Sequence, residues 1–369
     1  MASMHLSSAC GCVEMANRFL ESFDHYSARE QKWVNINLGG AGAALFTIGA
    51  GAKRTGLNGM AILHAAGANT YNIDVPGLTA KAQYIMGFAW RPTLLPTNFA
   101  VAALCRTLDA ATIQGALGVL MTGQLTLHRG GASTAALVQS TRAVKVGQWY
   151  YVEWKHLVNN GAGILEVRVN GEVWATFAGN TRISAANQAT AIGFGGSTQP
   201  QIGNKPTWDV DDIYVNDSDG GAPNNGYWGD TQAEARVPSA NSPTYQEWTT
   251  LVGAATHWQA TSEIPPDDVT SYIGSIVADQ RDTYTRPALG PAAATINALQ
   301  VNTRAAVDAL AGSFARMYRR AGADSQGGDT ALSTTWTYYL ETLEQDPLAG
   351  PGAWTLANVN AGEFGARGR

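Results

Sequence analysis

Charged residues are scarce in this chain of 369 residues. Asp, Glu, Lys and Arg make up 14% of it, and the net charge is -5, whereas an average soluble domain has roughly 25% charged residues. This balance excludes a general nucleic-acid binder, because neutralising phosphates requires a dense basic face. A surface so poor in charge is typical of a protein that packs against copies of itself or against partners. We therefore expect a homo-oligomer and no nucleic-acid partner.

Cysteine is nearly absent as well. Cys10, Cys12 and Cys105 are the three cysteines, and an odd number without a spaced framework argues against a disulfide-stapled secreted scaffold. Cys10-Gly11-Cys12 is C-x-C with no second ligand pair, so we expect no zinc site. Reduced cysteines fit folding in a cytoplasm.

Targeting signals and long apolar runs are also missing. Residues 1–6 have neither the basic start nor the apolar stretch of a signal peptide. Nowhere does the sequence contain the run of about 18 apolar residues that spans a membrane. We expect no membrane insertion.

Sequence motifs of catalysis are not found either. The glycine-rich stretch 193–196 has no Lys and no following helix, and residues 195–199 lack the last Gly of a serine-nucleophile motif. The histidines are scattered, without metal-binding spacing; they are His5, His25, His64, His128, His156 and His257. We predict no catalytic, metal or cofactor-binding residue and no cofactor.

What the sequence does contain is a period-two alternation over residues 148–215. Segments 149–155 and 164–169 alternate apolar and polar residues, as do 172–177 and 208–215. One face of each is apolar, which is typical of strands that cover a sandwich core and meet water on the other side. Asn170-Gly171 joins two of these strands and predicts a tight type I′ hairpin, because both turn residues need positive φ. Residues 81–90 are apolar on both faces, which predicts a central strand.

Several of these motifs recur together in a known family. W-Y-Y-V-E-W-K at 149–155, V-R-V-N-G-E-V at 167–173, G-F-G-G at 193–196 and V-D-D-I-Y-V-N-D at 210–217 resemble the second half of a concanavalin A-like, laminin-G-like jelly roll. The continuation through 224–230 and 238–240 resembles virion proteins of tailed bacteriophages. The resemblance implies an all-β fold, a jelly-roll sandwich followed by a second, smaller β-sandwich.

Turn-forming residues suggest where the chain divides. Residues 216–226 are almost all Asn, Asp, Ser, Gly or Pro. We predict an N-terminal arm at 1–17, a jelly-roll domain at 18–226, a linker at 227–240 and a second sandwich at 241–369. The acidic stretch 206–235 is interpreted as a solvated junction.

The second half is harder to interpret. Residues 292–320 are Ala-rich and fit a helical stripe, but part of them alternates as well; the resemblance favours two strands, which we adopt. Residues 332–339 predict a late strand, 264–268 a bend, and 355–360 one helical turn capped by the Thr355 hydroxyl.

Carboxylates deserve a separate test because jelly rolls of this type include glycosidases. The alternating Glu-Asp-Glu strand of such enzymes is absent, Glu153 and Glu166 stand alone, and Asp212 is expected to point away from Asp209 and Asp211. Asp209, Asp211, Asn216, Asp217 and Asp219 could instead bind Ca²⁺, although Asp and Asn are more often turn formers. The calcium question stays open.

Aromatic residues could stack on sugar rings but more often pack in cores. Trp228 and Trp258 lie beside polar loop residues, and we assign neither a ligand.

The resemblance and the lack of a catalytic constellation lead to one functional expectation. The chain is predicted to be a non-enzymatic structural component of a tailed-phage virion, assembled in the host cytoplasm, as a tail fibre, tip or collar appendage or a capsid decoration. Its partners would be other virion proteins. The alternative is an adhesin for host surface glycans, and a glycan hydrolase is a third hypothesis. Three carboxylates converging around a sugar-sized cleft would overturn the non-enzymatic interpretation.

Overall fold

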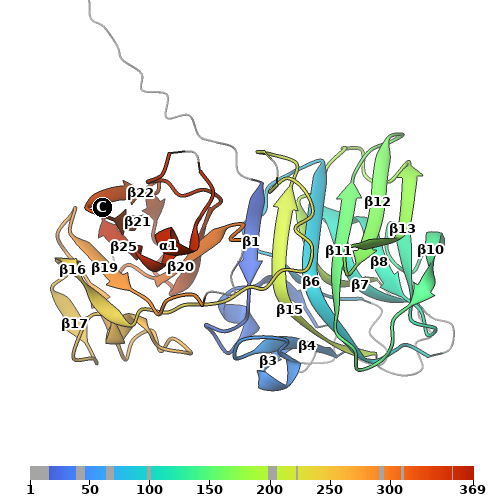
Figure 1. Ribbon diagram of the computed structural model, residues 1–369. Coiled ribbons are helices and arrows are strands. Elements are labelled where there is room, and N and C mark those ends of the chain that lie inside the picture. Colours follow the sequence, from blue (N-terminus) through green and yellow to red (C-terminus); the bar gives the residue numbers. More distant parts are fainter. Residues whose placement is uncertain are drawn as a thin grey trace, which may run out of the picture.

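The computed structural model describes residues 16–38, 46–63, 70–97, 101–197, 206–221, 223–290, 295–308, 311–350 and 352–369 (Figure 1). Two all-β bodies follow one another along the chain, a jelly-roll sandwich and a smaller sandwich. The all-β prediction is therefore confirmed. Residues 1–15 of the expected arm, with Cys10 and Cys12, lie outside the described residues.

One sheet of the jelly roll, here called the β6 sheet, has eight strands. They are β1 (Asn17–Glu21), β3 (Phe46–Gly49), β4 (Gly59–Leu63), β6 (Gln83–Leu94), β11 (Tyr150–Leu157), β12 (Gly163–Val169), β13 (Glu172–Gly179) and β15 (Thr207–Asp217). The order is β13-β12-β11-β6-β15-β4-β3, and β1 also pairs with β15. β6 is central, with β11 and β15 antiparallel on either side, as its two apolar faces predicted.

The opposing sheet, here called the β7 sheet, has seven strands in the order β10-β9-β8-β7-β14-β5-β2. They are β2 (Val34–Asn37), β5 (Thr70–Asp74), β7 (Ala102–Asp109), β8 (Thr112–Val119), β9 (Gln124–Arg129), β10 (Ala136–Ala143) and β14 (Ala191–Ser197). Two 3-10 turns lie in the same body, η1 (Arg29–Gln31) and η3 (Ala50–Ala52).

The hairpin between β12 and β13 forms where the dipeptide predicted it. Asn170 and Gly171 have φ of 51° and 80°. The flanking strands pair antiparallel from Val169 and Glu172 outward.

The smaller sandwich is built on a six-stranded sheet, here called the β21 sheet, in the order β16-β19-β25-β21-β22 with β23 beside β21. Its strands are β16 (Ala240–Gln246), β19 (Arg281–Thr285), β21 (Ser313–Arg320), β22 (Ala323–Gln326), β23 (Thr330–Ala331) and β25 (Glu363–Gly368). Two ribbons complete it, β17 (Thr250–Val252) with β18 (Tyr272–Gly274) and β20 (Leu299–Ala305) with β24 (Thr337–Leu343). The remaining elements are η4 (Gln259–Thr261) and α1 (Leu356–Asn360).

Two predictions in this half are confirmed and one is corrected. The stretch 292–320 contains β20 and β21 rather than a helix, and Thr355 Oγ1 accepts a hydrogen bond from the Asn358 N–H at the start of α1. The late strand begins at Thr337 and not at Leu332. Residues 332–336 turn instead, because the Ser333 N–H is bound by the Tyr339 hydroxyl and the Thr335 N–H by the Ser333 hydroxyl.

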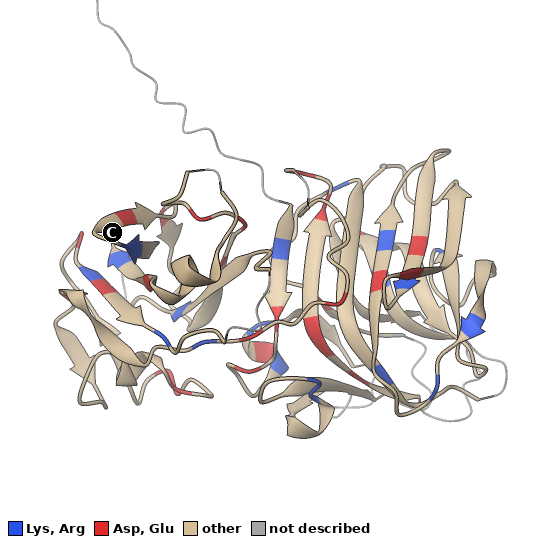
Figure 2. Ribbon diagram, in the orientation of Figure 1, with Lys and Arg blue, Asp and Glu red and all other residues tan. Residues whose placement is uncertain are grey.

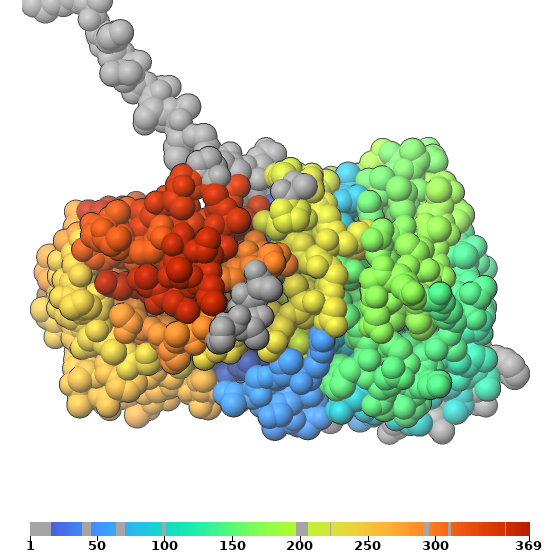
Figure 3. All heavy atoms as spheres, in the orientation of Figure 1, coloured from blue at the N-terminus to red at the C-terminus, as the bar shows by residue number. Residues whose placement is uncertain are grey.

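The two bodies touch along β1, where the β20–β24 ribbon packs against it (Figure 1), and the space-filling view shows the two bodies in contact (Figure 3). The Gln300 side-chain amide exchanges hydrogen bonds of 2.9 Å with both the N–H and the C=O of Leu20, as a strand neighbour would. The Tyr338 hydroxyl donates to the His25 carbonyl at 3.2 Å. Among the described residues no helix has the length and apolar character that a membrane span requires.

Candidate functional site: a hollow lined by carboxylates and aromatic rings

A hollow of about 1870 Å³ lies between the smaller sandwich and the jelly roll, which contributes Glu21, His25 and Tyr214 among others to its lining. Its lining includes the inner face of the β21 sheet, the β17–β18 and β20–β24 ribbons and residues 228–238. Pockets for small ligands usually measure roughly 300–1,000 Å³. This hollow is therefore large enough for an extended oligosaccharide.

Aromatic side chains line the hollow. Trp248, Tyr272, Trp336 and Tyr338 belong to its lining, and the rings of Tyr272 and Trp336 have centroids 6.2 Å apart at an interplanar angle of 58°. Trp248 is fixed by a 3.0 Å hydrogen bond from its Nε1 to the Gln280 carbonyl. Such amphipathic rings suit a ligand with apolar C–H faces and polar edges, which is the character of a sugar ring.

Three carboxylates lie in the lining on one loop, between η4 and β18. They are Glu263, Asp267 and Asp268. The Ser271 hydroxyl contacts both Glu263 and Asp267, the latter at 3.3 Å, and the Ser271 N–H donates to Asp267 Oδ1 at 2.9 Å. Because one hydroxyl carries one proton, it cannot donate to both carboxylates at once. The arrangement therefore sets two acidic groups on either side of a single donor.

Asp268 is held differently. Its carboxylate receives two hydrogen bonds from the Arg304 guanidinium, Nε to Oδ1 at 2.5 Å and Nη2 to Oδ2 at 2.6 Å. A bidentate pair of this kind is charge-assisted and geometrically specific. It positions the loop, whereas Glu263 and Asp267 on the same loop have no ion pair with any described residue.

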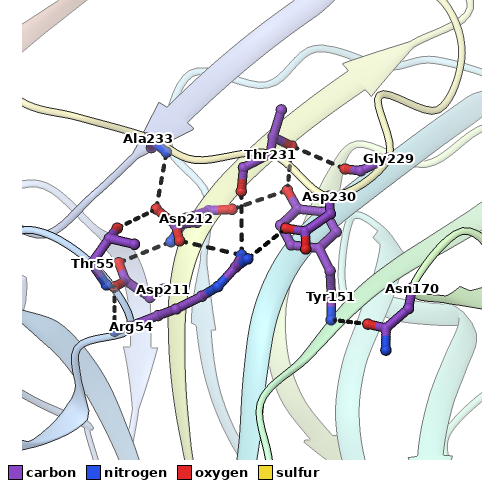
Figure 4. A network of polar contacts seen from close by, with 10 residues as sticks. All are labelled: Arg54, Thr55, Tyr151, Asn170, Asp211, Asp212, Gly229, Asp230, Thr231 and Ala233. Carbon is purple, nitrogen blue, oxygen red and sulfur yellow. Dashed lines mark hydrogen bonds and ion pairs between the residues drawn. The ribbon is translucent and has the colours of Figure 1, made fainter. Parts of the chain in front are cut away.

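The opposite wall is the segment 228–238, and a polar network fastens it to the jelly roll (Figure 4). Asp212 Oδ1 accepts hydrogen bonds of 2.9 Å from the Ala233 N–H and the Thr55 hydroxyl. Arg54 pairs with Asp230 at 2.7 Å and approaches Asp212 at 3.5 Å. Residues far apart in the sequence thus hold this wall in place.

Asp211 lies in the same network as Asp212. The expectation that the side chain of Asp212 points away from Asp211 is therefore wrong. A bulge between Asp211 and Tyr214, with Asp212 at φ 51°, directs both carboxylates toward Arg54 and Thr55 (Figure 4). Burial raises the pKa of Asp211 to about 7, aided by the charge of Asp212, while backbone N–H donors oppose the rise. Burial likewise raises the pKa of Asp212 to about 6.

A second set of contacts fixes the segment 228–238 to the jelly roll, through Tyr214 of β15 and Glu153 of β11. The ring of Trp228 stacks on Tyr214 with centroids 4.6 Å apart. Glu153 Oε1 accepts a 2.5 Å hydrogen bond from the Tyr214 hydroxyl and a 2.8 Å bond from the Gly229 N–H. Glu153 was expected to stand alone, and the structure corrects this. Glu153 and Trp228 both fix residues 228–229 to the β6 sheet.

The candidate calcium ligands are used elsewhere. Asp209 binds Arg91 at 2.7 Å, Asp217 binds Arg18 at 2.6 Å, and Asp219 contacts Arg18 and Lys81. Within the part of the chain that the structure describes, no three His, Cys, Asp or Glu side chains are grouped so that they could hold a metal ion. The acidic stretch is also no solvated junction, because four of its residues are at most 6% exposed; they are Asp209, Asp211, Asp212 and Asp217.

The carboxylates of the hollow were missed at the level of sequence. Residues 264–268 suggested only a bend, and that bend carries Asp267 and Asp268 while Glu263 precedes it. The available signal was three acids within six residues around a Pro-Pro pair. Only the fold brings Ser271 and Arg304 to them.

Comparison with known proteins identifies no family for this chain. No family model matches the chain, and no curated protein does. Among solved structures, an endo-β-1,4-glucuronan lyase from the fungus Trichoderma reesei matches with a TM-score of 0.41 and 11% identity, over 54% of this chain and 95% of that one. The cellulose-induced protein Cip1 matches at 0.42 and 15% over 54% and 96%, and the alginate lyase Aly36B at 0.37 and 13% over 55% and 98%.

These findings correct the functional expectation. The similar jelly rolls named here are two polysaccharide lyases and a cellulose-induced protein, and none is a virion protein. The prediction of a non-enzymatic structural component of a tailed-phage virion is therefore overturned, and with it the prediction that the chain is no enzyme. At 11–15% identity the likeness concerns the fold alone and assigns this chain neither substrate nor reaction.

Proposed function

We propose that this chain is a carbohydrate-active protein that binds a polysaccharide segment in the hollow beside its smaller sandwich and hydrolyses it with Glu263 and Asp267. The observation that carries the proposal is the pair of unpaired carboxylates sharing the Ser271 hydroxyl in the lining of a sugar-sized, aromatic-lined hollow.

The chemistry follows from the two acids. Hydrolysis of a glycosidic bond uses one carboxylic acid to protonate the leaving oxygen and one carboxylate to act as nucleophile or to activate water. Glu263 and Asp267 would fill these roles, and Ser271 would fix their orientation. Asp268, neutralised by Arg304, would act as a positioning residue.

Reducing-sugar release from a panel of purified polysaccharides tests the proposal. For any polysaccharide that wild type cleaves, Glu263→Gln and Asp267→Asn should each lower the rate by about 10²–10⁴-fold, the usual contribution of a general acid or base. Asp329→Asn is the matched control, because Asp329 is an exposed acid of the same sandwich that pairs with Arg369. Full activity in both hollow variants, or release from no polysaccharide, would refute the assignment.

The partners of the chain remain proposals. A cell-surface or extracellular glycan fits the proposed activity, and the low charge still favours a homo-oligomer, which sedimentation of the full chain would test. Location in a virion remains a prediction that no observation here tests.

A further inference from the structure

Arg286 differs from every other described arginine of the smaller sandwich. Those others each have an Asp or Glu oxygen within 4.0 Å; they are Arg236, Arg281, Arg304, Arg316, Arg319, Arg320, Arg367 and Arg369. No described carboxylate lies within that distance of Arg286, which follows β19 and belongs to the lining of the hollow. A positive charge is therefore left without a counter-ion beside the hollow.

The side chain of Arg286 is nonetheless well fixed. Its guanidinium carbon lies 3.7 Å from the centroid of the Phe364 ring, and Nη2 donates to the carbonyls of Val359 and Gly362 at 3.4 Å. Its Nε is buried and has no hydrogen-bond partner. One donor is thus unsatisfied in a guanidinium that packing has already oriented.

A second positive charge lies close enough to affect the first. Burial is the main reason that the pKa of Arg286 is lowered to about 10; Tyr318 opposes this shift, and the positive charge of Arg236 contributes to it. Arg236 lines the same hollow, pairs with Glu234 and likewise keeps a buried Nε without a partner. Glu234 already neutralises Arg236, so Arg286 is the cation without a counter-ion at this partly dry surface, which is costly unless an anion joins it.

The geometry points to an acidic-group subsite at Arg286 and Arg236, so that the saccharide bound in the hollow carries carboxylate or sulfate groups. The planar guanidinium fork matches such groups with charge-assisted hydrogen bonds, and binding would supply the missing counter-ion. This inference rests on the proposed function, since it names the class of saccharide for the same hollow. It requires binding only and not cleavage.

Calorimetric binding to the full chain carrying Glu263→Gln tests it without turnover. The probes are a β-1,4-linked glucuronate oligomer, a cello-oligomer of equal length as its neutral counterpart, and the sulfated cello-oligomer. We expect at least one acidic oligomer to bind tenfold or more tightly than the neutral one, and its affinity to fall as salt rises. The two acidic probes distinguish a carboxylate from a sulfate ligand.

Variants then locate the subsite. Arg286→Gln should lower the affinity for the preferred acidic oligomer about tenfold or more and leave the neutral oligomer unchanged, and Arg236→Gln should act in the same direction as a second variant in case the first does not fold. Arg367→Gln, which removes an arginine paired with the exposed Asp279, is the control. Equal affinity for acidic and neutral oligomers, no binding of either acidic oligomer, or no effect of either variant would overturn the inference. Preferential acidic binding by a chain that cleaves no polysaccharide would uphold the subsite and refute only the hydrolytic function.

Discussion

The two bodies of this molecule are built from the same kind of secondary structure but differ in how they fill their interiors. The jelly roll has a continuous core that includes the fully buried indoles of Trp90, Trp154 and Trp208. In the described part of the smaller sandwich the buried cluster is much smaller, with Tyr318, Trp354, Val359 and Phe364 at its centre, and it lies beside a hollow of about 1870 Å³. Two strand-rich segments of one chain thus give one body with a packed core and one body beside a hollow.

Strand length accounts for much of the difference. β6 and β15 are 12 and 11 residues long, so their apolar faces cover the facing sheet. β17 and β18 have three residues each, and the loops around them expose Val269 and Ile276. Short ribbons cannot cover the β21 sheet fully, and the uncovered space is available to a ligand.

Both bodies carry charged residues of either sign (Figure 2), but the buried carboxylates of the jelly roll and the acids of the loop 263–268 differ in their partners. In the jelly roll several carboxylates are buried and committed to fixed partners, such as Asp74 with Arg106 at 2.8 Å. In the hollow Glu263 and Asp267 have no cation partner among the described residues. Buried, paired acids stabilise a scaffold, whereas accessible, unpaired acids can react.

The largest expected difference between the two bodies is in the loss of unfolding free energy when an indole side chain is removed. Trp154→Ala in the jelly roll should lower the free energy of unfolding by about 3–5 kcal/mol, because it leaves a cavity in a packed core. Trp336→Ala, in the lining of the hollow, should cost far less since no packed cavity results. Urea unfolding of both variants measures the difference, and equal losses would show that the hollow is not open.

Adding a methyl group tests how tightly each body is packed, because a crowded position has no room for it. A Cβ at Gly87 of β6 would collide with the Tyr214 ring, whereas a Cβ at Gly328 would have no heavy atom within 4 Å. Gly87→Ala should therefore cost about 1–3 kcal/mol, and Gly328→Ala close to nothing. Thermal unfolding distinguishes them, and a neutral Gly87→Ala would contradict the close contact between β6 and β15.

The pH dependence of stability concerns the junction between the bodies. The folded-state pKa of Asp211 is raised to about 7 from an ordinary value of 3.8, so between these values the folded state binds more protons than the unfolded state. Its contribution to stability is therefore lost as pH rises from about 4 to about 7, with a slope of up to about 1.4 kcal/mol per pH unit. Asp211→Asn, which cannot ionise, should lack this slope.

Urea unfolding of wild type and Asp211→Asn at several pH values checks this. The variant should gain stability relative to wild type as pH increases through that window. A constant difference from pH 4 to pH 8 would mean that Asp211 ionises normally in the folded chain.

The sequence was informative wherever burial repeats with period two. The central position of β6, the Asn170-Gly171 hairpin and the capped turn at Thr355 all follow from local residues. It misjudged Asp212, because a bulge reverses the direction of a side chain that simple alternation would place on the other face. It missed the site because Glu263, Ser271 and Arg304 come from a loop, the edge of a strand and a distant ribbon.

By itself the sequence predicted an all-β protein, because alternation within a strand is a local property that fixes which face is buried, and its resemblance to a known family implied that a jelly roll comes first. Only the tertiary structure decided that a hollow lies beside the second half and that Glu263 and Asp267 there lack a cation partner among the described residues. Whether a carboxylate is neutralised depends on cations from remote segments of the chain. Packing places Arg304 against Asp268 but places Arg286 over the Phe364 ring, without a carboxylate partner among the described residues.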